Sequence, residues 1–235
     1  MTSVTGRRRR IQRRDTFLRD AARLPPKLRN ENAMSAPAEL REEEAGADPF
    51  DLFRRWFDEA VLSGAPQPEA MTVATATPDG VPSARIVLLR GFDEAGFQFF
   101  TNYSSRKAHE LAHNPRAALV LHWSVLGRQI RFEGAVERVS DAEADAYFRT
   151  RPRGHQLSAW ISAQSEVIAG REVLEQAAQD LGRRYPNEVP RPPFWGGYRV
   201  RPDCIEFWQS RENRLHDRLR YRRVGSDWLR ERLAP

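Results

Sequence analysis

The chain carries the stretch Ile205-Glu-Phe-Trp-Gln209 and, one residue later, the stretch Arg211-Glu-Asn-Arg-Leu-His-Asp-Arg218. The first is rich in the aromatic and β-branched residues that favour a half-buried strand. In the second, Arg214, His216 and Arg218 alternate, so on a strand or an extended turn their side chains lie on one side. Two guanidinium groups and an imidazole at the end of an aromatic strand predict a site for a planar, anionic molecule.

Further strands are predicted before and after this stretch. Pro78-Asp-Gly80 separates two of them as a hairpin turn, and Gly134 predicts a β-bulge inside another. The expected strands are 71–77, 83–90, 97–101, 117–123, 129–139, 198–209, 218–224 and 227–232. Many short strands with few helices indicate a mainly β, α+β fold, namely an antiparallel barrel with peripheral helices.

Helix signals are fewer but specific. Asp48 and Pro49 have the residue types of an N-cap and a first helical position. Ser140 and Glu143 form the pattern of a capping box. The expected helices are about 49–63, 141–150 and 170–184, and a further short helix is expected before Asn114-Pro115. The chain contains no Gly-x-Gly-x-x-Gly and no Walker loop, so a Rossmann or P-loop fold has little support.

The composition limits the class of protein. With 235 residues, 40% hydrophobic content, six Trp and twelve Phe, the chain can build one large domain or two small ones with a real core. No apolar run is long enough for a membrane span, and no signal-peptide pattern is found. Cys204 is the only cysteine, which excludes an internal disulfide and a cysteine-based zinc site. We therefore expect a cytoplasmic protein.

The net charge of +6 is unevenly distributed. Residues 1–33 contain ten basic and three acidic residues, whereas the remainder contains 28 basic and 29 acidic residues. The run Arg7–Arg10 suits nucleic acid, but no nucleic-acid module follows, so a solvated tail is the better interpretation. We expect residues 1–47 to form a basic extension without stable structure, with Met34 as a candidate natural start, and residues 48–235 to form one domain.

A first cationic cluster is predicted around Thr101-Asn-Tyr-Ser-Ser-Arg-Lys107, between a strand and a short helix. A serine would cap this helix and place Arg106 and Lys107 in its first turn, where the helix dipole disfavours cations unless an anion is present. Helix N–H groups, hydroxyls and two cations together suit a phosphate. Arg85, which lies among apolar strand residues and needs a partner, supports that interpretation over a solvated basic turn.

A second cationic cluster is predicted at Tyr147 and Arg151, which lie four residues apart and so share a helix face. A phenol and a guanidinium there can hold a second phosphate, although a basic residue at a helix C-terminus also interacts favourably with the dipole alone. Gln129, Gln164 and Ser165 add neutral amide and hydroxyl groups that suit the edge of a heteroaromatic ring.

His109-Glu-Leu-Ala-His113 matches the H-E-x-x-H pattern of zinc proteases. The expected helix is short, ends at Asn114-Pro115, and is followed by no third ligand on the same helix. We therefore interpret the two histidines as surface or packing residues and expect no metal.

In their order along the chain, these motifs resemble the pyridoxine/pyridoxamine 5′-phosphate oxidase family, the FMN-dependent split-barrel flavoproteins. The resemblance covers about residues 48–235. It rests on Arg85-Ile-Val-Leu-Leu89, Thr101-Asn102, Ser105-Arg-Lys107, Arg151-Pro-Arg153, Gln164-Ser165, Phe194-Trp-Gly-Gly197, Ile205-Glu-Phe-Trp-Gln209, Arg214-Leu-His-Asp-Arg218 and Arg232-Leu-Ala-Pro235. It implies an FMN-binding split β-barrel, a homodimer with two equivalent sites, and oxidation of pyridoxine or pyridoxamine 5′-phosphate by dioxygen to pyridoxal 5′-phosphate.

The resemblance also implies roles for individual residues. The implied cofactor-binding residues, partly from the second subunit, are Arg85, Ile86, Val87, Leu88, Leu89, Arg90, Phe100, Thr101, Arg106, Lys107, Gln129, Gln164, Ser165, Trp208 and Arg218. The implied substrate-binding residues are Arg90, Tyr147, Arg151, His155, Arg214, Leu215 and His216. As candidate catalytic residues, Arg214 would lie over the pyridine ring and His216 would bind the oxygen substituent of that ring.

Two positions depart from the family pattern. Arg90 stands where the family usually has a lysine near the substrate phosphate, and a forked guanidinium needs a different geometry. His155 stands where a small serine usually helps to bind the same phosphate. A protonated imidazole would bind phosphate more strongly than serine, and a neutral one more weakly.

Two alternatives remain open. One is a related phenazine-type flavin oxidase acting on a substrate without phosphate, which would leave Tyr147 and Arg151 without a counter-charge. The other is a non-catalytic binder of flavin or pyridoxal phosphate, which would not need the ring alignment that Arg214 and His216 supply.

Overall fold

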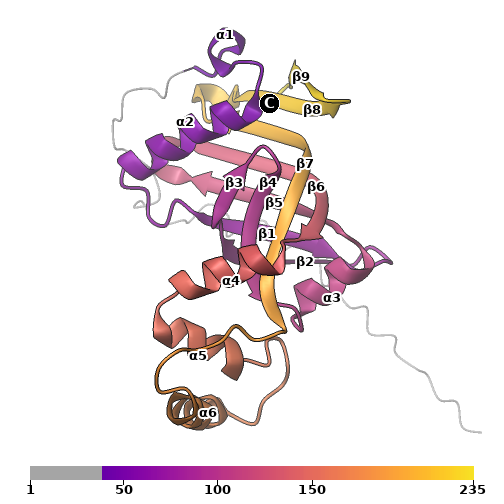
Figure 1. The fold of residues 1–235 in the computed structure, drawn as a ribbon. Coiled ribbons are helices and arrows are strands. Elements are labelled where there is room, and N and C mark those ends of the chain that lie inside the picture. The colour runs from indigo at the N-terminus through magenta and orange to yellow at the C-terminus, as the bar shows by residue number, and fades with distance from the viewer. Residues whose placement is uncertain (1–38) are drawn as a thin grey trace, which may run out of the picture. The chain divides into compact units, whose positions relative to one another are not determined.

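The computed structural model describes residues 39–235; the expectations for residues 1–38, including Met34 as a start, lie outside this range. The helices are α1 (Glu42–Ala45), α2 (Pro49–Leu62), α3 (Arg106–His113), α4 (Asp141–Thr150), α5 (Arg153–Ile161) and α6 (Arg171–Arg184) (Figure 1). The strands are β1 (Ala70–Ala76), β2 (Pro82–Leu88), β3 (Gly91–Asp93), β4 (Gly96–Asn102), β5 (Arg116–Trp123), β6 (Arg128–Arg138), β7 (Trp195–Gln209), β8 (Asp217–Val224) and β9 (Asp227–Arg232). Short 3-10 turns cover Ser124–Leu126 and Glu212–Arg214.

The described residues form one nine-stranded antiparallel sheet in the order β2-β1-β5-β6-β7-β4-β3, with β8 paired to β7 and β9 paired to β8. The long strand β7 organises it, because β6 pairs along most of its length. The other edge of β7 pairs with β4 in its first half and with β8 in its second half. The sheet therefore curls into a half-barrel with helices around it, which confirms the expected mainly β, α+β split-barrel fold.

The bend of β6 has a local cause at Gly134. The pairing register between β6 and β7 shifts between Glu133 and Gly134, which is the predicted bulge. A β-carbon at Gly134 would lie 2.0 Å from the carbonyl oxygen of Arg201, so only glycine fits this close approach.

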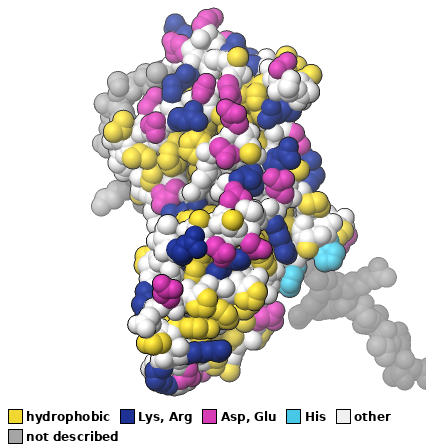
Figure 2. Space-filling view, in the orientation of Figure 1, with side chains coloured by type: hydrophobic (Ala, Val, Ile, Leu, Met, Phe, Trp, Pro, Cys, Tyr) yellow, Lys and Arg dark blue, Asp and Glu magenta, His cyan; other side chains and the backbone are white. Residues whose placement is uncertain are grey.

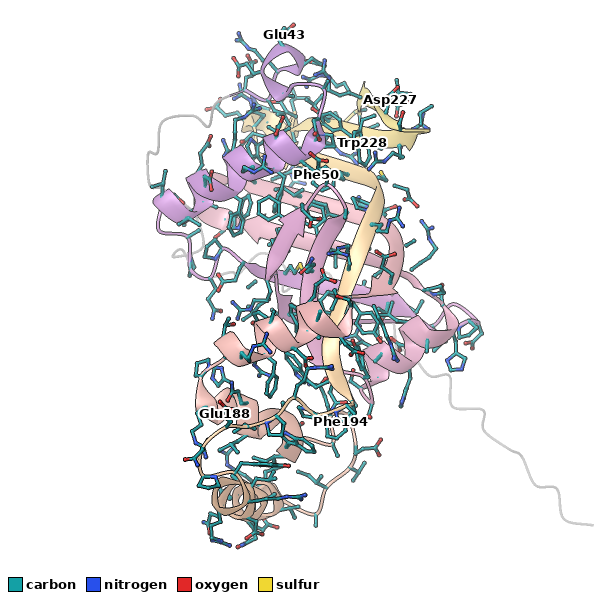
Figure 3. The ribbon with its side chains drawn as sticks, viewed as in Figure 1. Glu43, Phe50, Glu188, Phe194, Asp227 and Trp228 are labelled. Atoms are coloured by element: carbon teal, nitrogen blue, oxygen red, sulfur yellow. The ribbon has the colours of Figure 1, made fainter. Side chains whose placement is uncertain are left out.

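Helix α2 supplies the aromatic centre of the core. The ring of Phe53 lies 5.0 Å from Phe97 and 5.4 Å from Phe132, in edge-to-face contacts that rings prefer. At the start of the helix, Phe50 lies 6.3 Å from Trp228 of β9, where Figure 3 labels both residues. Alternating burial along β1 and β5 presents the other side of this core.

The expected helices are close to the observed ones, and both halves of the capping box of Ser140 and Glu143 are present. Helix α5 was not expected, because Pro152 at its N-cap and Gly154 in its first turn indicate a turn. Strand β3 was not expected either, since its three residues are too few for a periodic pattern.

Residues 39–46 pack against β8 and β9. The hydroxyl of Tyr221 donates to the carbonyl oxygen of Gly46 at 3.0 Å, and the Arg232 guanidinium binds the carboxylate of Glu42 at 2.6 Å. Leu40 is buried in the same place. The expected domain boundary at residue 48 therefore lies inside the packed domain.

No helix within residues 39–235 is long and apolar enough to span a membrane. On the face drawn in Figure 2, basic and acidic side chains are mixed over the whole surface, without a large field of one sign. This agrees with the nearly neutral charge of the sequence after residue 33 and gives a nucleic-acid backbone no extended basic track on this face.

Candidate functional site

A cleft of about 1230 Å³ lies between β2, β4 and the helices α3, α4 and α5. Its lining brings together side chains from segments that are up to about 110 residues apart in the chain, from Ser83 to Trp195. The sequence-predicted residues that line it are Arg85, Ile86, Val87, Leu88, Arg90, Phe100, Thr101, Arg106, Lys107, Tyr147, Arg151, His155, Gln164 and Ser165. The cleft therefore contains both predicted cationic clusters.

The first cationic cluster, Arg85, Arg106, Lys107 and Ser165, includes a buried ammonium group. Lys107 Nζ donates to Thr101 Oγ1 at 3.0 Å and to Gln164 Oε1 at 2.9 Å, so these partners are neutral oxygens. Burial, and then the charge of Arg85, lower the pKa of Lys107 to about 8. A bound anion would stabilise the charged form of this lysine.

Hydroxyl groups contact the other members of this cluster. Arg85 Nη1 donates to Thr75 Oγ1 at 2.6 Å, and burial lowers the pKa of this guanidinium. The backbone N–H of Arg106, at the start of α3, donates to Ser165 Oγ at 3.2 Å. Ser165 has a φ of 79°, a left-handed conformation that turns the loop toward the helix N-terminus. A helix N-terminus with cations and hydroxyls around it fits a phosphate.

The second cationic cluster, Arg90, Tyr147, Arg151 and His155, lies at the end of α4. Arg151 Nη1 is buried without a hydrogen-bond partner, and the guanidinium carbon lies 4.5 Å from the ring centroid of Trp195. Burial lowers the pKa of Arg151, and the charge of Arg90 lowers it further. A buried donor without a partner costs about 1–3 kcal/mol, and a bound anion would remove that cost.

Gln129, Trp208 and Arg218 form a row across β6, β7 and β8. Gln129 is paired with Trp208, and Trp208 with Arg218, so the three side chains share one face of the sheet. The ring of His216 lies 4.6 Å from that of Trp208. The backbone N–H of Arg211 donates to His216 Nδ1 at 3.1 Å, which leaves Nε2–H of the neutral imidazole as a donor for a ligand.

Arg214 follows in the turn before β8, with a φ of 61° after Asn213 at 54°. Left-handed backbone is uncommon for such residues and often occurs at functional sites. Arg214 and Leu215 are both exposed. With Gln129, Trp208, His216 and Arg218, they make up what we call the C-terminal cluster.

The structure does not bring the C-terminal cluster to the cleft of the same chain, since none of its six residues lines that cleft. Figure 1 shows β8 and β9 at the opposite end of β7 from α4, α5 and α6. Leu89 does not line the cleft either, because its side chain is buried in the core. The resemblance implied that part of the flavin-binding site comes from a second subunit. That expectation is compatible with the distance between the cleft and the C-terminal cluster in one chain.

Two contributors to the cleft region were missed from sequence. Trp195, quoted only within the family motif Phe194-Trp-Gly-Gly197 and given no role at the site, stacks at 5.6 Å on Phe100 inside the cleft. Glu110, dismissed with the H-E-x-x-H pattern, is buried beside the first cationic cluster, whereas His109 and His113 are exposed. The signal for Glu110 was its position one turn after two basic residues. Among residues 39–235, no three metal-ligating side chains come together.

The half-barrel and its doubly cationic cleft define the class of FMN-binding split-barrel proteins. Two family models match the sequence. The model described as "Pyridoxamine 5′-phosphate oxidase" matches residues 57–184, and the model described as "Pyridoxine 5′-phosphate oxidase C-terminal dimerisation region" matches residues 195–235. The chain belongs to the pyridoxine/pyridoxamine 5′-phosphate oxidase family. The second match contains β7, β8 and β9 and supports the expected homodimer.

Similar proteins agree with this membership. The pyridoxine/pyridoxamine 5′-phosphate oxidase of Rubrobacter xylanophilus is 59% identical over 84% of this chain and 92% of that protein. The enzyme of the same name from Cupriavidus necator is 56% identical over 83% of this chain and 93% of that protein. A solved structure of PhzG from Burkholderia lata, in complex with tetrahydrophenazine-1-carboxylic acid, has a TM-score of 0.81 and 33% identity over 85% of this chain and all of that one.

FMN is the cofactor of this family, and therefore of this chain. The residues present fit it on independent grounds. The first cationic cluster offers a buried ammonium, a guanidinium, a hydroxyl and the start of a helix, which together suit the phosphate of FMN.

Proposed function

We propose that this chain oxidises pyridoxine 5′-phosphate and pyridoxamine 5′-phosphate to pyridoxal 5′-phosphate. The alcohol and dioxygen would give the aldehyde and hydrogen peroxide, and the amine, dioxygen and water would give the aldehyde, ammonia and hydrogen peroxide. The observation that carries the proposal is the presence of two anion sites in one cleft, with Arg151 Nη1 buried and without a partner in the second. A cofactor and a substrate that each carry a phosphate match this pair of sites.

The residues of the chain would bind and orient the two ligands. Arg85, Lys107 and Ser165 would hold the cofactor phosphate, and Tyr147 and Arg151 the substrate phosphate. Bound FMN would supply the hydride acceptor, and the protein would supply position and charge.

The C-terminal cluster would come from the partner subunit. There Arg214 would lie over the pyridine ring, and His216, whose Nδ1 is occupied by the Arg211 N–H, would donate from Nε2 to the ring oxygen substituent. Gln129, Trp208 and Arg218 would contact the flavin. Fixing the substrate ring between this cluster and the flavin would align the reacting carbon and so lower the barrier to transfer. Dioxygen as acceptor and a cytoplasmic location are parts of the same proposal.

Anaerobic mixing of the FMN-loaded protein with pyridoxine 5′-phosphate tests the function. We expect the visible flavin band to bleach, and then to recover with formation of pyridoxal 5′-phosphate when air is admitted. Tight FMN binding without bleaching would contradict the proposed substrate. It would favour the phenazine-type alternative or a non-catalytic binder. Reaction with a non-phosphorylated ring acid distinguishes these two, because only the phenazine-type oxidase would oxidise it.

His155 gives a prediction for substrate binding. It lies exposed in the first turn of α5 and lines the cleft together with Arg151. An imidazole at this position can donate a hydrogen bond to the substrate phosphate, and a hydrogen bond to a charged group contributes about 1.5–3 kcal/mol. Steady-state kinetics of His155→Ala should therefore show a substrate KM that is about ten-fold higher. His113→Ala, which changes an exposed histidine of α3 outside the cleft, is the matched control, and an unchanged KM in His155→Ala would contradict the role of His155.

A further inference from the structure

We propose that Glu110 is a positioning residue for the cofactor, because its buried carboxylate holds the guanidinium groups of Arg85 and Arg106 beside the site of the FMN phosphate. The inference rests on the proposed placement of that phosphate in the first cationic cluster. Glu110 lies in the second turn of α3, and its side chain is 4% exposed. A buried carboxylate is stable only when it is paired and hydrogen-bonded, so its partners show what it does.

The two oxygens of Glu110 join three elements. Oε1 accepts from Arg106 Nε at 2.8 Å, within α3. Oε2 accepts from Ser83 Oγ of β2 at 2.6 Å and from Thr75 Oγ1 of β1, and lies 3.6 Å from Arg85 Nη2. The same two hydroxyls accept from the Arg85 guanidinium, Thr75 at 2.6 Å and Ser83 at 2.5 Å. Glu110 thereby fixes Arg85 both directly and through two hydroxyl groups.

The charges of the cluster also require Glu110. Arg85, Arg106 and Lys107 bring three positive charges to one end of the cleft, and like charges at such distances repel one another. Three cations and one carboxylate have a net charge of +2. This balances the charge of about −2 that a phosphate monoester carries at neutral pH. Glu110 therefore holds the cations together without cancelling the attraction for a dianion.

Glu110 stays ionised in this position. Burial alone would raise the pKa of its carboxyl, but the hydrogen bonds from Ser83, Thr75 and Arg106 outweigh burial and hold the pKa at about 2. Its negative charge in turn raises the pKa of Lys107, against the effects of burial and of Arg85. Glu110 acts on Lys107 through its charge alone, since the hydrogen-bond partners of Lys107 are Thr101, Ser105 and Gln164, which carry no charge. Removing the charge of Glu110 should thus make Lys107 lose its proton at a lower pH.

Glu110→Gln tests the inference by titration of the flavin-free protein with FMN and with riboflavin, which lacks the phosphate, following flavin fluorescence. We expect the Kd for FMN to rise about ten-fold, since a hydrogen-bonded charged partner is lost, and the Kd for riboflavin to stay unchanged. FMN affinity should fall when Lys107 loses its proton at high pH. In Glu110→Gln this fall should begin at a lower pH than in the unmodified protein. Glu231→Gln is the matched control, because Glu231 also joins two arginines, Arg220 and Arg222, outside the cleft, and should change neither Kd.

Two results would overturn the inference. If FMN binds equally well or more tightly to Glu110→Gln, the carboxylate only weakens the attraction for phosphate. If riboflavin and FMN lose affinity equally, Glu110 supports the fold and not the phosphate site.

Lys107→Met distinguishes failure of the inference about Glu110 from failure of the proposed cofactor site, since unchanged FMN affinity in Lys107→Met would place the phosphate elsewhere. Should Glu110→Gln not fold, Ser83→Ala removes one link and should show a smaller loss of the same FMN-selective kind; an equal loss for both flavins would overturn the inference.

Discussion

Arg214→Ala is expected to lower kcat/KM for pyridoxine 5′-phosphate by about 100-fold, the scale expected when a positioning contact on a reacting substrate is lost. FMN binding should be nearly unchanged, because Arg214 is exposed and does not line the cleft that contains the cofactor phosphate cluster. Steady-state kinetics together with the flavin content of the purified variant measure both effects. Loss of FMN from Arg214→Ala would contradict a role confined to the substrate.

The same variant tests whether each site is built from two chains. Arg151→Ala removes the phosphate site of the cleft, and Arg214→Ala removes the C-terminal cluster. If each site takes the cleft from one subunit and the cluster from its partner, a mixed dimer of these two variants contains one intact site. Unfolding and refolding the two variants together should then restore about a quarter of the full activity, because about half of the dimers are mixed and each has one working site.

A control pairing makes this result interpretable. Arg214→Ala mixed with His216→Ala places both changes in the C-terminal cluster, so every site of every dimer lacks one of the two groups and activity should stay low. Recovery in this control would show that refolding itself, and not complementation, raises the activity. No recovery in the first mixture would mean that cleft and cluster act within one chain, against the separation seen in the fold.

Lys107→Met is expected to weaken FMN binding by about 10- to 100-fold at pH 7, since it removes a charge-assisted hydrogen bond to the phosphate and a buried positive charge. In the flavin-free protein the pKa of Lys107 is lowered to about 8 by burial first and then by Arg85. A bound dianion favours the protonated form, so FMN affinity should be full below about pH 8 and fall as the pH rises above it. The Kd for FMN measured by fluorescence from pH 7 to pH 9.5 follows this change.

In Lys107→Met, FMN affinity should be weaker and should no longer fall between pH 8 and 9.5. Lys107→Arg keeps its charge throughout this range, so its FMN affinity should not fall between pH 8 and 9.5. Riboflavin shares the flavin ring but not the phosphate. Its affinity should therefore have the same pH dependence in the unmodified protein, in Lys107→Met and in Lys107→Arg. A decline in FMN affinity that persists in Lys107→Met would assign the titration to another group.

Much of the fold was predictable because its signals are local. Asp48 with Pro49 and Ser140 with Glu143 marked helix starts that the structure contains, and Gly134 marked the bulge. Helix α5 was missed because Pro152 and Gly154 read as a turn in isolation, while packing onto the Trp195 region stabilises a helix there. Residues 39–46 were assigned to a tail because their contacts, with β8 and β9, lie at the far end of the chain.

The sequence by itself determined the family, the strand pattern and the two cationic clusters, since these depend on residue types at fixed spacing. Only the tertiary structure decided which of these residues share a cleft. It placed Arg85, Lys107, Tyr147 and Arg151 together and left the C-terminal cluster at the other end of β7. It also turned Glu110 from part of an apparent metal motif into the link between Arg85 and Arg106. The physical reason is that strand register and helix packing set long-range distances, and neither is specified by the residues next to one another in the chain.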